Sequence, residues 1–152
     1  MTTDIWKPNT VVAAIVEVEH RFLFVEELND GRAVFNQPAG HLDPDETLLQ
    51  AVQRETLEEA GCEIAPLGLV GIYLMEPPGS TTTYVRYCFH AALVKHYPDR
   101  ALDTEILRAL WMTRDELAEQ SARHRSPLVL RCVDDYLTGK RHPLSLINDL
   151  RF

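Results

Sequence analysis

The chain has 152 residues, enough for a hydrophobic core, and we expect a single domain over residues 1–152. Apolar residues make up 45% and charged residues 25% of the chain, as in an ordinary soluble globular protein. Lys and Arg number 15 against 23 Asp and Glu, so the formal net charge is -8. This balance argues against nonspecific binding to nucleic acids or anionic membranes, although an anionic ligand can still bind through an intervening cation.

The cysteines and the N-terminal segment point to a cytoplasmic protein. Cys62, Cys88 and Cys132 are odd in number, widely spaced and without a C-x-x-C pair, so they form neither a disulfide framework nor a zinc site. We expect reduced, buried thiols. The N-terminal segment has an early acid and a proline, which a signal peptide lacks, and no apolar run approaches the roughly 20 residues of a membrane span.

The chain begins with signals for β-structure. Residues 11–18 (VVAAIVEV) are apolar and β-branched, and residues 21–27 (RFLFVEE) alternate more loosely. Their separation near Glu19-His20 predicts a hairpin. Residues 31–40 (GRAVFNQPAG) predict a short strand that ends at a Pro-Ala-Gly turn.

The next segment predicts a helix followed by two strands. Residues 47–60 lack Gly and Pro and place Leu and Val at helical intervals, and Gly61 follows at the usual position just past a helix end. Residues 63–76 and 81–94 are apolar and predict two strands, with the turn sequence PPGS between them.

The last part predicts one more strand and two helices. Residues 105–113 predict the strand, and Thr113 is the expected N-cap of a helix that begins there. Residues 126–140 predict a second helix, with Ser126 as its cap and Gly139 at its end. The order of strands, helix, strands and helices indicates an α+β or mixed α/β layered fold rather than a regular βαβ alternation.

Three glutamates of the helix over residues 47–60 share one face. At about 100° per residue, Glu55, Glu58 and Glu59 fall within an arc of about 100° beside the core-facing stripe. Ala51 falls on the same arc one turn earlier, and we expect it to leave an open patch for a small ion. Repulsion, partial burial and the negative end of the helix dipole all oppose this cluster. The spacing alone also fits a solvated acidic face, but a bound cation would offset these costs, and oxygen ligands favour Mg²⁺ or Mn²⁺ over Ca²⁺.

The acidic helix lies within a longer pattern of fixed spacing. Its invariant positions are occupied by Gly40, Glu46, Arg54, Glu55, Glu58, Glu59 and Gly61. This arrangement matches the Nudix box, G-x5-E-x7-R-E-U-x-E-E-x-G-U, in which U is a bulky aliphatic residue, and the chain therefore resembles the Nudix hydrolase family. Thr56 and Cys62 depart from the pattern at two U positions, which bears on local packing rather than on the chemistry.

Two flanking segments resemble the NudJ-like phosphatase branch of that family. These are residues 35–43 (FNQPAGHLD) and residues 124–130 (HRSPLVL). The resemblance implies an α/β/α sandwich around a mixed sheet, in which the box forms a loop, a helix and a loop. It implies Mg²⁺-dependent substitution by water at phosphorus in nucleoside di- and triphosphates and in thiamine-type pyrophosphates. The sequence contains no heptad repeat and no obvious apolar patch, so we expect a monomer or a dimer. Hydrolysis of ADP-ribose or dinucleoside polyphosphates, a noncatalytic nucleotide-binding domain and an acidic partner surface remain alternatives.

The resemblance also implies roles for individual residues. The implied metal ligands are Glu55, Glu58, Glu59 and the main-chain carbonyl of Ala39. Arg54 and Glu46 match the ion pair that orients the catalytic glutamates. The general base remains open between Glu55, Glu58 and a later acid, for which Glu105 has the matching location and Asp103 is its neighbour.

The substrate-binding residues are less well determined by the sequence. Gln37 lies on the strand that enters the box, Arg86 lies on a later strand, and Arg125 precedes the Ser-Pro pair. We expect these three to contact the substrate, although surface charge is an ordinary role for each arginine. His41 directly follows Gly40 and is a candidate for the entrance of the site.

Overall fold

The computed structural model describes residues 3–151, and a long antiparallel hairpin opens its sheet. The strands are β1 (Asn9–Val18), β2 (Arg21–Asn29), β3 (Arg32–Asn36), β4 (Ala39–His41), β5 (Cys62–Met75), β6 (Tyr84–His96) and β7 (Ile106–Thr113). The turn between β1 and β2 holds Glu19 and His20 at φ of 50° and 65°, as a two-residue hairpin turn requires. The predicted hairpin is therefore confirmed at its predicted turn.

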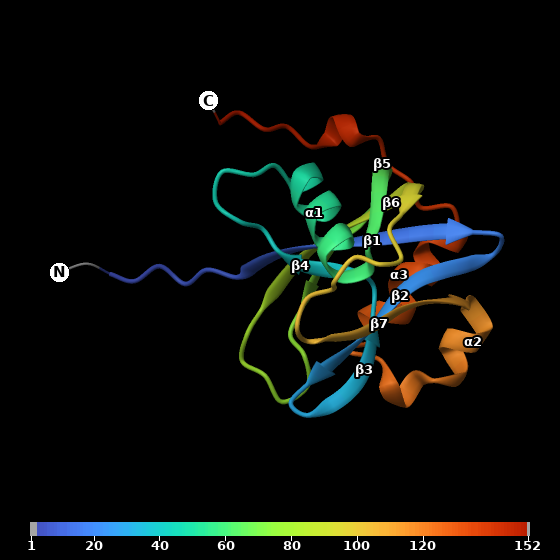
Figure 1. Ribbon diagram of the computed structural model, residues 1–152. Helices are drawn as coiled ribbons and strands as arrows, with labels where there is room; N and C mark the ends of the chain where they lie inside the picture. Colours follow the sequence, from blue (N-terminus) through green and yellow to red (C-terminus); the bar gives the residue numbers. More distant parts are fainter. Residues whose placement is uncertain (1–2, 152) are drawn as a thin grey trace.

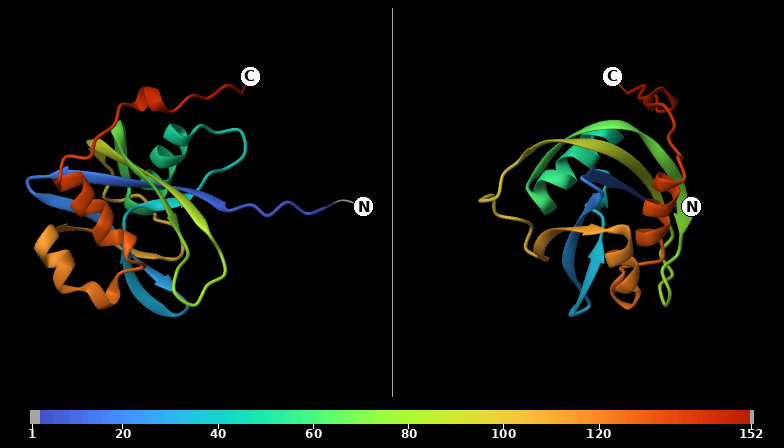
Figure 2. Two further views of the ribbon diagram at one scale, coloured as in Figure 1. Left: turned by 180° about the vertical axis from the view of Figure 1, so that it is seen from behind. Right: turned by 90° about the vertical axis from the view of Figure 1, so that its right-hand side faces the viewer.

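The sheet is mixed and divides into two halves. The strand order is β3-β2-β1-β6-β5, with β4 paired to β1 and β7 paired to β2. β1 and β6 run parallel, whereas the other pairs are antiparallel. Because β1 and β2 pair only at the hairpin end, β5-β6-β1-β4 and β3-β2-β7 splay apart from that end (Figure 2).

Helices cover both sides of β1. They are α1 (Leu48–Ala60), α2 (Arg114–Glu119) and α3 (Leu128–Leu137), with 3₁₀ turns η1 (Ser121–Arg123) and η2 (Leu144–Leu146). Figures 1 and 2 show α1 on one side of β1 and α3 on the other. This arrangement confirms the expected layered fold around a mixed sheet.

Strand β1 is apolar and buried from Val11 to Val16 because this stretch supplies two cores. Val12, Ala14 and Val16 pack in the core beside α1. Ala13 and Ile15 point the other way and pack in the core beside α3. Successive side chains of a strand face opposite sides of the sheet. When both sides are covered, no side chain of the covered stretch faces solvent, so apolar residues occupy every position there.

The ends of α1 follow the sequence signals. Thr47 Oγ1 accepts a hydrogen bond from the Gln50 amide at 3.0 Å, and the Gln50 side chain accepts one from the Thr47 amide at 2.9 Å. Gly61 ends the helix at φ 65°, in the left-handed region that glycine adopts readily. Local sequence signals therefore determine where the helix begins and where it ends.

The expectations for the two later helices hold in part. Thr113 caps α2 as expected. Ser126 was expected to cap α3, but the N-cap is Pro127, and Ser126 Oγ instead accepts from the Leu128 amide at 3.2 Å just before the helix. The three cysteines are free and buried. Within residues 3–151, every helix is too short or too polar to cross a lipid bilayer.

Candidate active site

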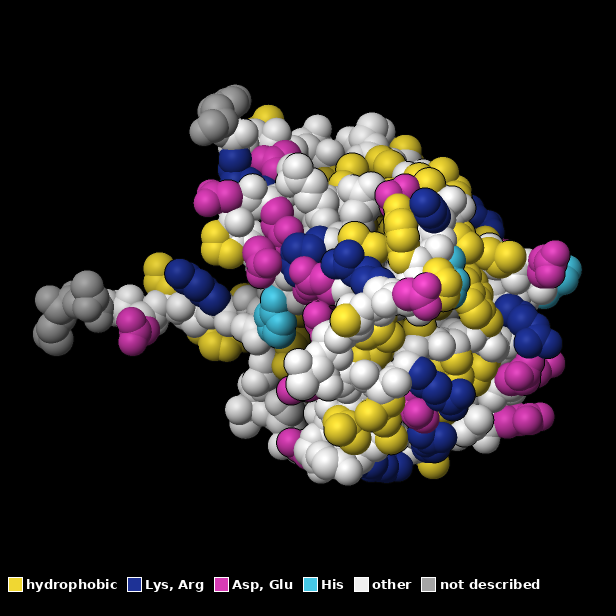
Figure 3. All heavy atoms as spheres, in the orientation of Figure 1, with side chains coloured by type: hydrophobic (Ala, Val, Ile, Leu, Met, Phe, Trp, Pro, Cys, Tyr) yellow, Lys and Arg dark blue, Asp and Glu magenta, His cyan; other side chains and the backbone are white. Residues whose placement is uncertain are grey.

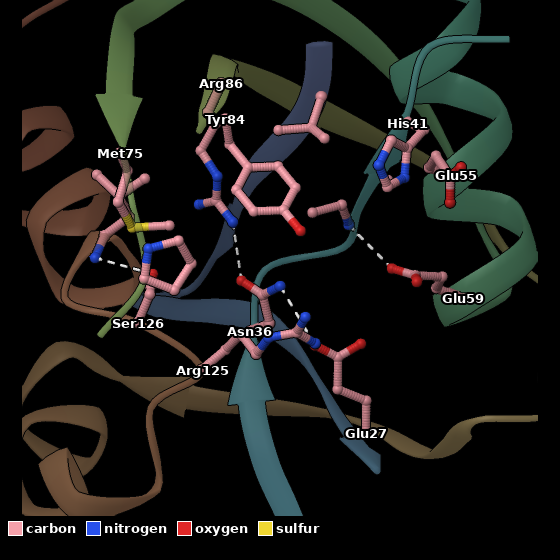
Figure 4. A pocket seen from close by; sticks show the side chains of 15 residues that line it. Glu27, Asn36, His41, Glu55, Glu59, Met75, Tyr84, Arg86, Arg125 and Ser126 are labelled. Atoms are coloured by element: carbon pink, nitrogen blue, oxygen red, sulfur yellow. Dashed lines mark hydrogen bonds and ion pairs between the residues drawn. The ribbon is translucent and has the colours of Figure 1, made fainter. Parts of the chain in front are cut away.

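A cleft of about 330 Å³ opens between α1 and the start of α3. Glu55 and Glu59 line one end of it, and Arg86 and Arg125 line the other (Figure 4). The cleft therefore places carboxylates and guanidinium groups at opposite ends of one space. On the face seen in Figure 3, acidic side chains gather around the loop that enters α1, with basic side chains among them.

A group of three carboxylates lies beside the acidic end of the cleft. Glu55, Glu58 and Asp103 each offer an oxygen, and these oxygens lie within 4.8 Å of one another. The Asp103 amide donates to the Glu58 carbonyl at 3.0 Å. Carbonyls in the last turn of a helix have no partner within the helix, so the loop after β6 docks on one of them and brings its carboxylate to α1.

The prediction of an open patch over Ala51 is wrong. Ala51 is fully buried and packs in the core on the α1 side of β1. Its small side chain fits between α1 and the strands, leaving no space there for an ion. The acidic group is completed instead by Asp103, which comes from outside the helix.

Arg54 holds the glutamates of α1 and the preceding loop together. Its Nε and Nη2 donate to the two carboxylate oxygens of Glu46 at 2.9 and 2.6 Å. Its Nη1 donates to Glu55 at 2.8 Å and to Glu58 at 3.2 Å. Hydrogen bonds from Arg54 hold the pKa of Glu46 below its ordinary value. The expected pair of Arg54 and Glu46 is thus present and reaches two members of the acidic group.

Two glutamates of α1 are buried at a cost to their charged forms. Burial raises the pKa of Glu59 to about 9, although its carboxylate accepts a hydrogen bond from the Ala39 amide at 2.9 Å. Burial also raises the pKa of Glu55, against the opposing effect of Arg54. A buried carboxylate gains most from a nearby positive charge, so this end of the cleft is suited to a cation.

Gly40 is required by the closeness of β4 to Glu55. A Cβ atom at this position would overlap the Glu55 carboxylate. The glycine of the box therefore makes room for the Glu55 carboxylate rather than for an unusual backbone conformation. The bare backbone of β4 forms one wall beside Glu55, as a compact oxygen-lined site needs.

The cationic end is built on the buried side chain of Arg86. Its Nη2 donates to Asn36 Oδ1 at 2.9 Å, and its Nη1 donates to Gln37 Oε1 at 3.0 Å. Gln37 is fully buried and donates in turn to the Val129 carbonyl at 2.6 Å. The structure thus places Gln37 beneath Arg86 rather than in the cleft, because its amide is used to join β3 to α3.

Arg125 completes this end from the segment before α3. Its Nη1 donates to Glu27 Oε1 at 3.1 Å, and its amide donates to the Phe35 carbonyl at 2.8 Å. Asn36 Nδ2 donates to the same Glu27 oxygen at 3.4 Å. Glu27 and Asn36 were not expected at the site from the sequence, and their only signal was polar character at strand positions that are buried here.

Glu105 does not join the acidic group. Its side chain is exposed, and its carbonyl accepts from the Leu28 amide at 3.0 Å. Asp103, two residues earlier, occupies the place that the sequence suggested for a later acid. Between the two ends of the cleft, the rings of His41 and Tyr84 lie 6.2 Å apart, so His41 does line the cleft.

Comparison with known proteins decides the family. Residues 6–132 match the model of the NUDIX domain. The chain belongs to the Nudix family. As a Nudix hydrolase it acts on phosphoric anhydride bonds.

Similar proteins support this assignment along most of the chain. Phosphatase NudJ of Escherichia coli (strain K12) is 37% identical over 147 residues, which cover 97% of this chain and 95% of that protein. A NUDIX hydrolase from Nitrosomonas europaea superposes with a TM-score of 0.92 at 46% identity, covering 94% of this Nudix hydrolase and 97% of that chain. An ADP-ribose pyrophosphatase from Streptococcus suis, at 18% identity, a TM-score of 0.67 and coverage of 90% and 96%, shares the fold alone.

Proposed function

We propose that this Nudix hydrolase uses Mg²⁺ or Mn²⁺ to hydrolyse nucleoside di- and triphosphates and, as a NudJ-like enzyme, thiamine-type pyrophosphates. One observation carries the proposal: three carboxylates of α1 and the Asp103 loop converge beside a cleft whose far end holds two arginines. Such a cleft can bind a cation and a phosphate chain together. The net charge of -8 is consistent with a small-molecule substrate rather than nucleic acid. We further propose that the enzyme is a single domain and acts in the cytoplasm.

The donor set fits a divalent metal ion. Glu55, Glu58 and Asp103 offer hard oxygen ligands at close range, with no His or Cys among them. These residues would hold the metal, and Glu59 and the Ala39 carbonyl are the further ligands that we propose. When bound, the metal would offset the negative charge of the phosphate chain and lower the pKa of a bound water.

The remaining residues position groups and accept a proton. Arg54, held by Glu46, keeps Glu55 and Glu58 in place through the hydrogen bonds described above. A carboxylate of the acidic group accepts the proton of the attacking water. Of the two later acids, Asp103 rather than Glu105 belongs to this group, and we propose it as a metal ligand or, in place of Glu55 or Glu58, as the base, because a base must reach the water within hydrogen-bonding distance.

The test is hydrolysis of a substrate panel in the presence of Mg²⁺. The panel contains nucleoside di- and triphosphates, thiamine pyrophosphate, ADP-ribose and dinucleoside polyphosphates, with phosphate and pyrophosphate measured separately. We expect phosphate from the nucleotides and from thiamine pyrophosphate. Activity confined to ADP-ribose or dinucleotides would overturn the proposed substrate, and tight nucleotide binding without turnover would instead indicate a binding domain.

A further inference from the structure

Arg86 is a buried cation without a carboxylate partner in the part of the chain that the structure describes. The residue is 5% exposed, and its guanidinium contacts are the amide oxygens of Asn36 and Gln37 and the Cys132 sulfur at 3.8 Å. The sulfur is a weak acceptor, and a guanidinium cannot lose its proton in a protein. A buried charge without a counter-ion is costly, so this guanidinium lacks a component that would complete its environment.

One donor of Arg86 is available to a ligand. Among residues 3–151, no hydrogen-bond partner is found for its Nε, yet every fully buried side-chain nitrogen or oxygen there has a partner. The Nε is therefore not fully enclosed by protein, and Arg86 lines the cleft (Figure 4). Asn36 and Gln37 hold the two terminal nitrogens of the guanidinium, which leaves Nε as the donor without a partner in the described part of the chain.

The nearest carboxylate in this network is already engaged. Glu27 accepts from Arg125 and from the Asn36 amide nitrogen, while the Asn36 oxygen accepts from Arg86. Asn36 thus stands between Glu27 and Arg86. Two guanidinium groups therefore meet one carboxylate at this end of the cleft, which leaves a positive charge.

The first turn of α3 adds to this positive charge. Ser126 and Leu128 line the cleft where the helix begins, and a helix N-terminus favours a negatively charged group. The arginines and the helix come from separate elements, β6 and the segment that enters α3. These positive groups converge on the cleft beside a guanidinium donor that has no partner among the described residues, which is the arrangement expected of an anion-binding site.

We propose that Arg86, Arg125 and the first turn of α3 form a subsite for the free terminal phosphoryl group of the substrate. This rests on the proposed function, which places the scissile anhydride at the acidic end. The second pKa of a phosphate monoester is roughly 6, so a free terminal phosphoryl group carries about 1.5 to 2 negative charges near pH 7. A phosphoryl group that is capped by a second sugar or nucleoside carries a single negative charge. The enzyme therefore prefers nucleoside di- and triphosphates over anhydrides capped by a second sugar or nucleoside. The cleft volume of about 330 Å³ is consistent with this, since it is small for a ligand site.

ADP and ADP-ribose test the preference directly, because they differ only in the cap on the terminal phosphoryl group. We expect kcat/KM to be higher for ADP in the unaltered enzyme. Arg86→Gln should lower kcat/KM for ADP by about 10- to 100-fold, as expected for a lost hydrogen bond to a charged group, and should affect ADP-ribose much less. Arg131→Gln is the matched control, since Arg131 pairs with Asp135 at the surface and does not line the cleft. Equal losses on both substrates, or a native preference for ADP-ribose, would overturn the proposal.

A thermal melt in EDTA tests the subsite without any metal or turnover. Orthophosphate should raise the melting temperature of the native protein and of Glu58→Gln above sodium chloride of equal ionic strength, and should not raise that of Arg86→Gln. Arg125→Gln, at a more exposed position, should lose part of the effect and serves as the second variant if Arg86→Gln does not fold. Failure of orthophosphate to stabilise the native protein would overturn the subsite. Retained phosphate binding by a protein that hydrolyses nothing would support the subsite and contradict the proposed function alone.

Discussion

Glu58 is the acid that most directly links α1 to the later loop. Its carboxylate lies in the group with Glu55 and Asp103, and its carbonyl accepts from the Asp103 amide. Replacing the carboxylate by an amide leaves the backbone contact in place while removing one charge. A change at Glu58 therefore separates its proposed role as a metal ligand from its structural role.

We expect Glu58→Gln to lower kcat at least about 100-fold, because even residues that only support metal ligands cost 10- to 100-fold when changed. Its melting temperature in EDTA should equal or exceed that of the native protein, since one repulsive carboxylate is gone. Phosphate release and a thermal melt on the same preparation provide the two measurements. Native-like turnover in this variant would remove Glu58 from the metal site.

Gly40→Ala tests whether the closeness of β4 to Glu55 matters for catalysis. The added methyl group would overlap the Glu55 carboxylate and push it aside. Because a displacement of about 1 Å can cost about 100-fold in rate, we expect a large fall in kcat with the fold retained. Circular dichroism provides the fold control, and unchanged activity would mean that the Glu55 position observed in the structure is not the active one.

At the scale of elements, the capping box of α1 also supports the site. Thr47 follows Glu46, whose carboxylate holds Arg54. Thr113 forms a capping box of the same kind on α2, where no residue of the acidic group lies. Residues 3–151 thus contain two similar caps, of which the one at Thr47 is next to a residue of the box and the one at Thr113 is not.

Thr47→Ala should lower the free energy of unfolding by about 1 kcal/mol, and Thr113→Ala should do the same. A change of this size shifts the melting temperature by roughly 2–4 °C in a chain of this length. Only Thr47→Ala should also reduce kcat, since fraying of the first turn loosens Glu46. Equal effects of the two changes on kcat would show that the cap acts through overall stability.

The elements that the sequence predicted well are those set by local signals. Thr47 and Gly61 determine the ends of α1, and Glu19 and His20 adopt the turn that the hairpin needs. The helical spacing alone places Glu55 on the same side as the other box glutamates. None of these depends on contacts between distant segments.

The parts of the site that the sequence did not predict depend on distant contacts. Asp103 rather than Glu105 joins the acids because the loop docks on the Glu58 carbonyl. Asn36 and Gln37 are neighbours on the chain, and neighbouring side chains of an extended segment point to opposite faces. Which of the two meets the cleft depends on where α3 packs, and its Val129 carbonyl takes up Gln37.

For the whole molecule, we expect the buried acids to couple stability to pH and to the proposed metal ion. Burial raises the pKa of Glu59 from about 4.5 to about 9, so between these values the folded chain binds a proton that the unfolded chain has lost. Stability of the metal-free protein should therefore fall as pH rises through this window. Glu46 acts in the opposite sense, because its lowered pKa adds stability that is lost only in acid, below its unfolded pKa near 4.5.

In thermal melts in EDTA from pH 5 to pH 9, the melting temperature should thus fall as pH rises. Glu59→Gln should flatten this slope because it removes the titrating carboxyl group, while the glutamine can still accept a hydrogen bond from the Ala39 amide. Saturating Mg²⁺ should raise the melting temperature of the native protein by roughly 5–10 °C at about 100 times its Kd. This gain should grow with pH, because protons and the metal compete for the same carboxylates. Parallel slopes for the native and Glu59→Gln proteins would show that the Glu59 carboxyl is ionised without cost, and that its place beside the cleft does not depend on a cation.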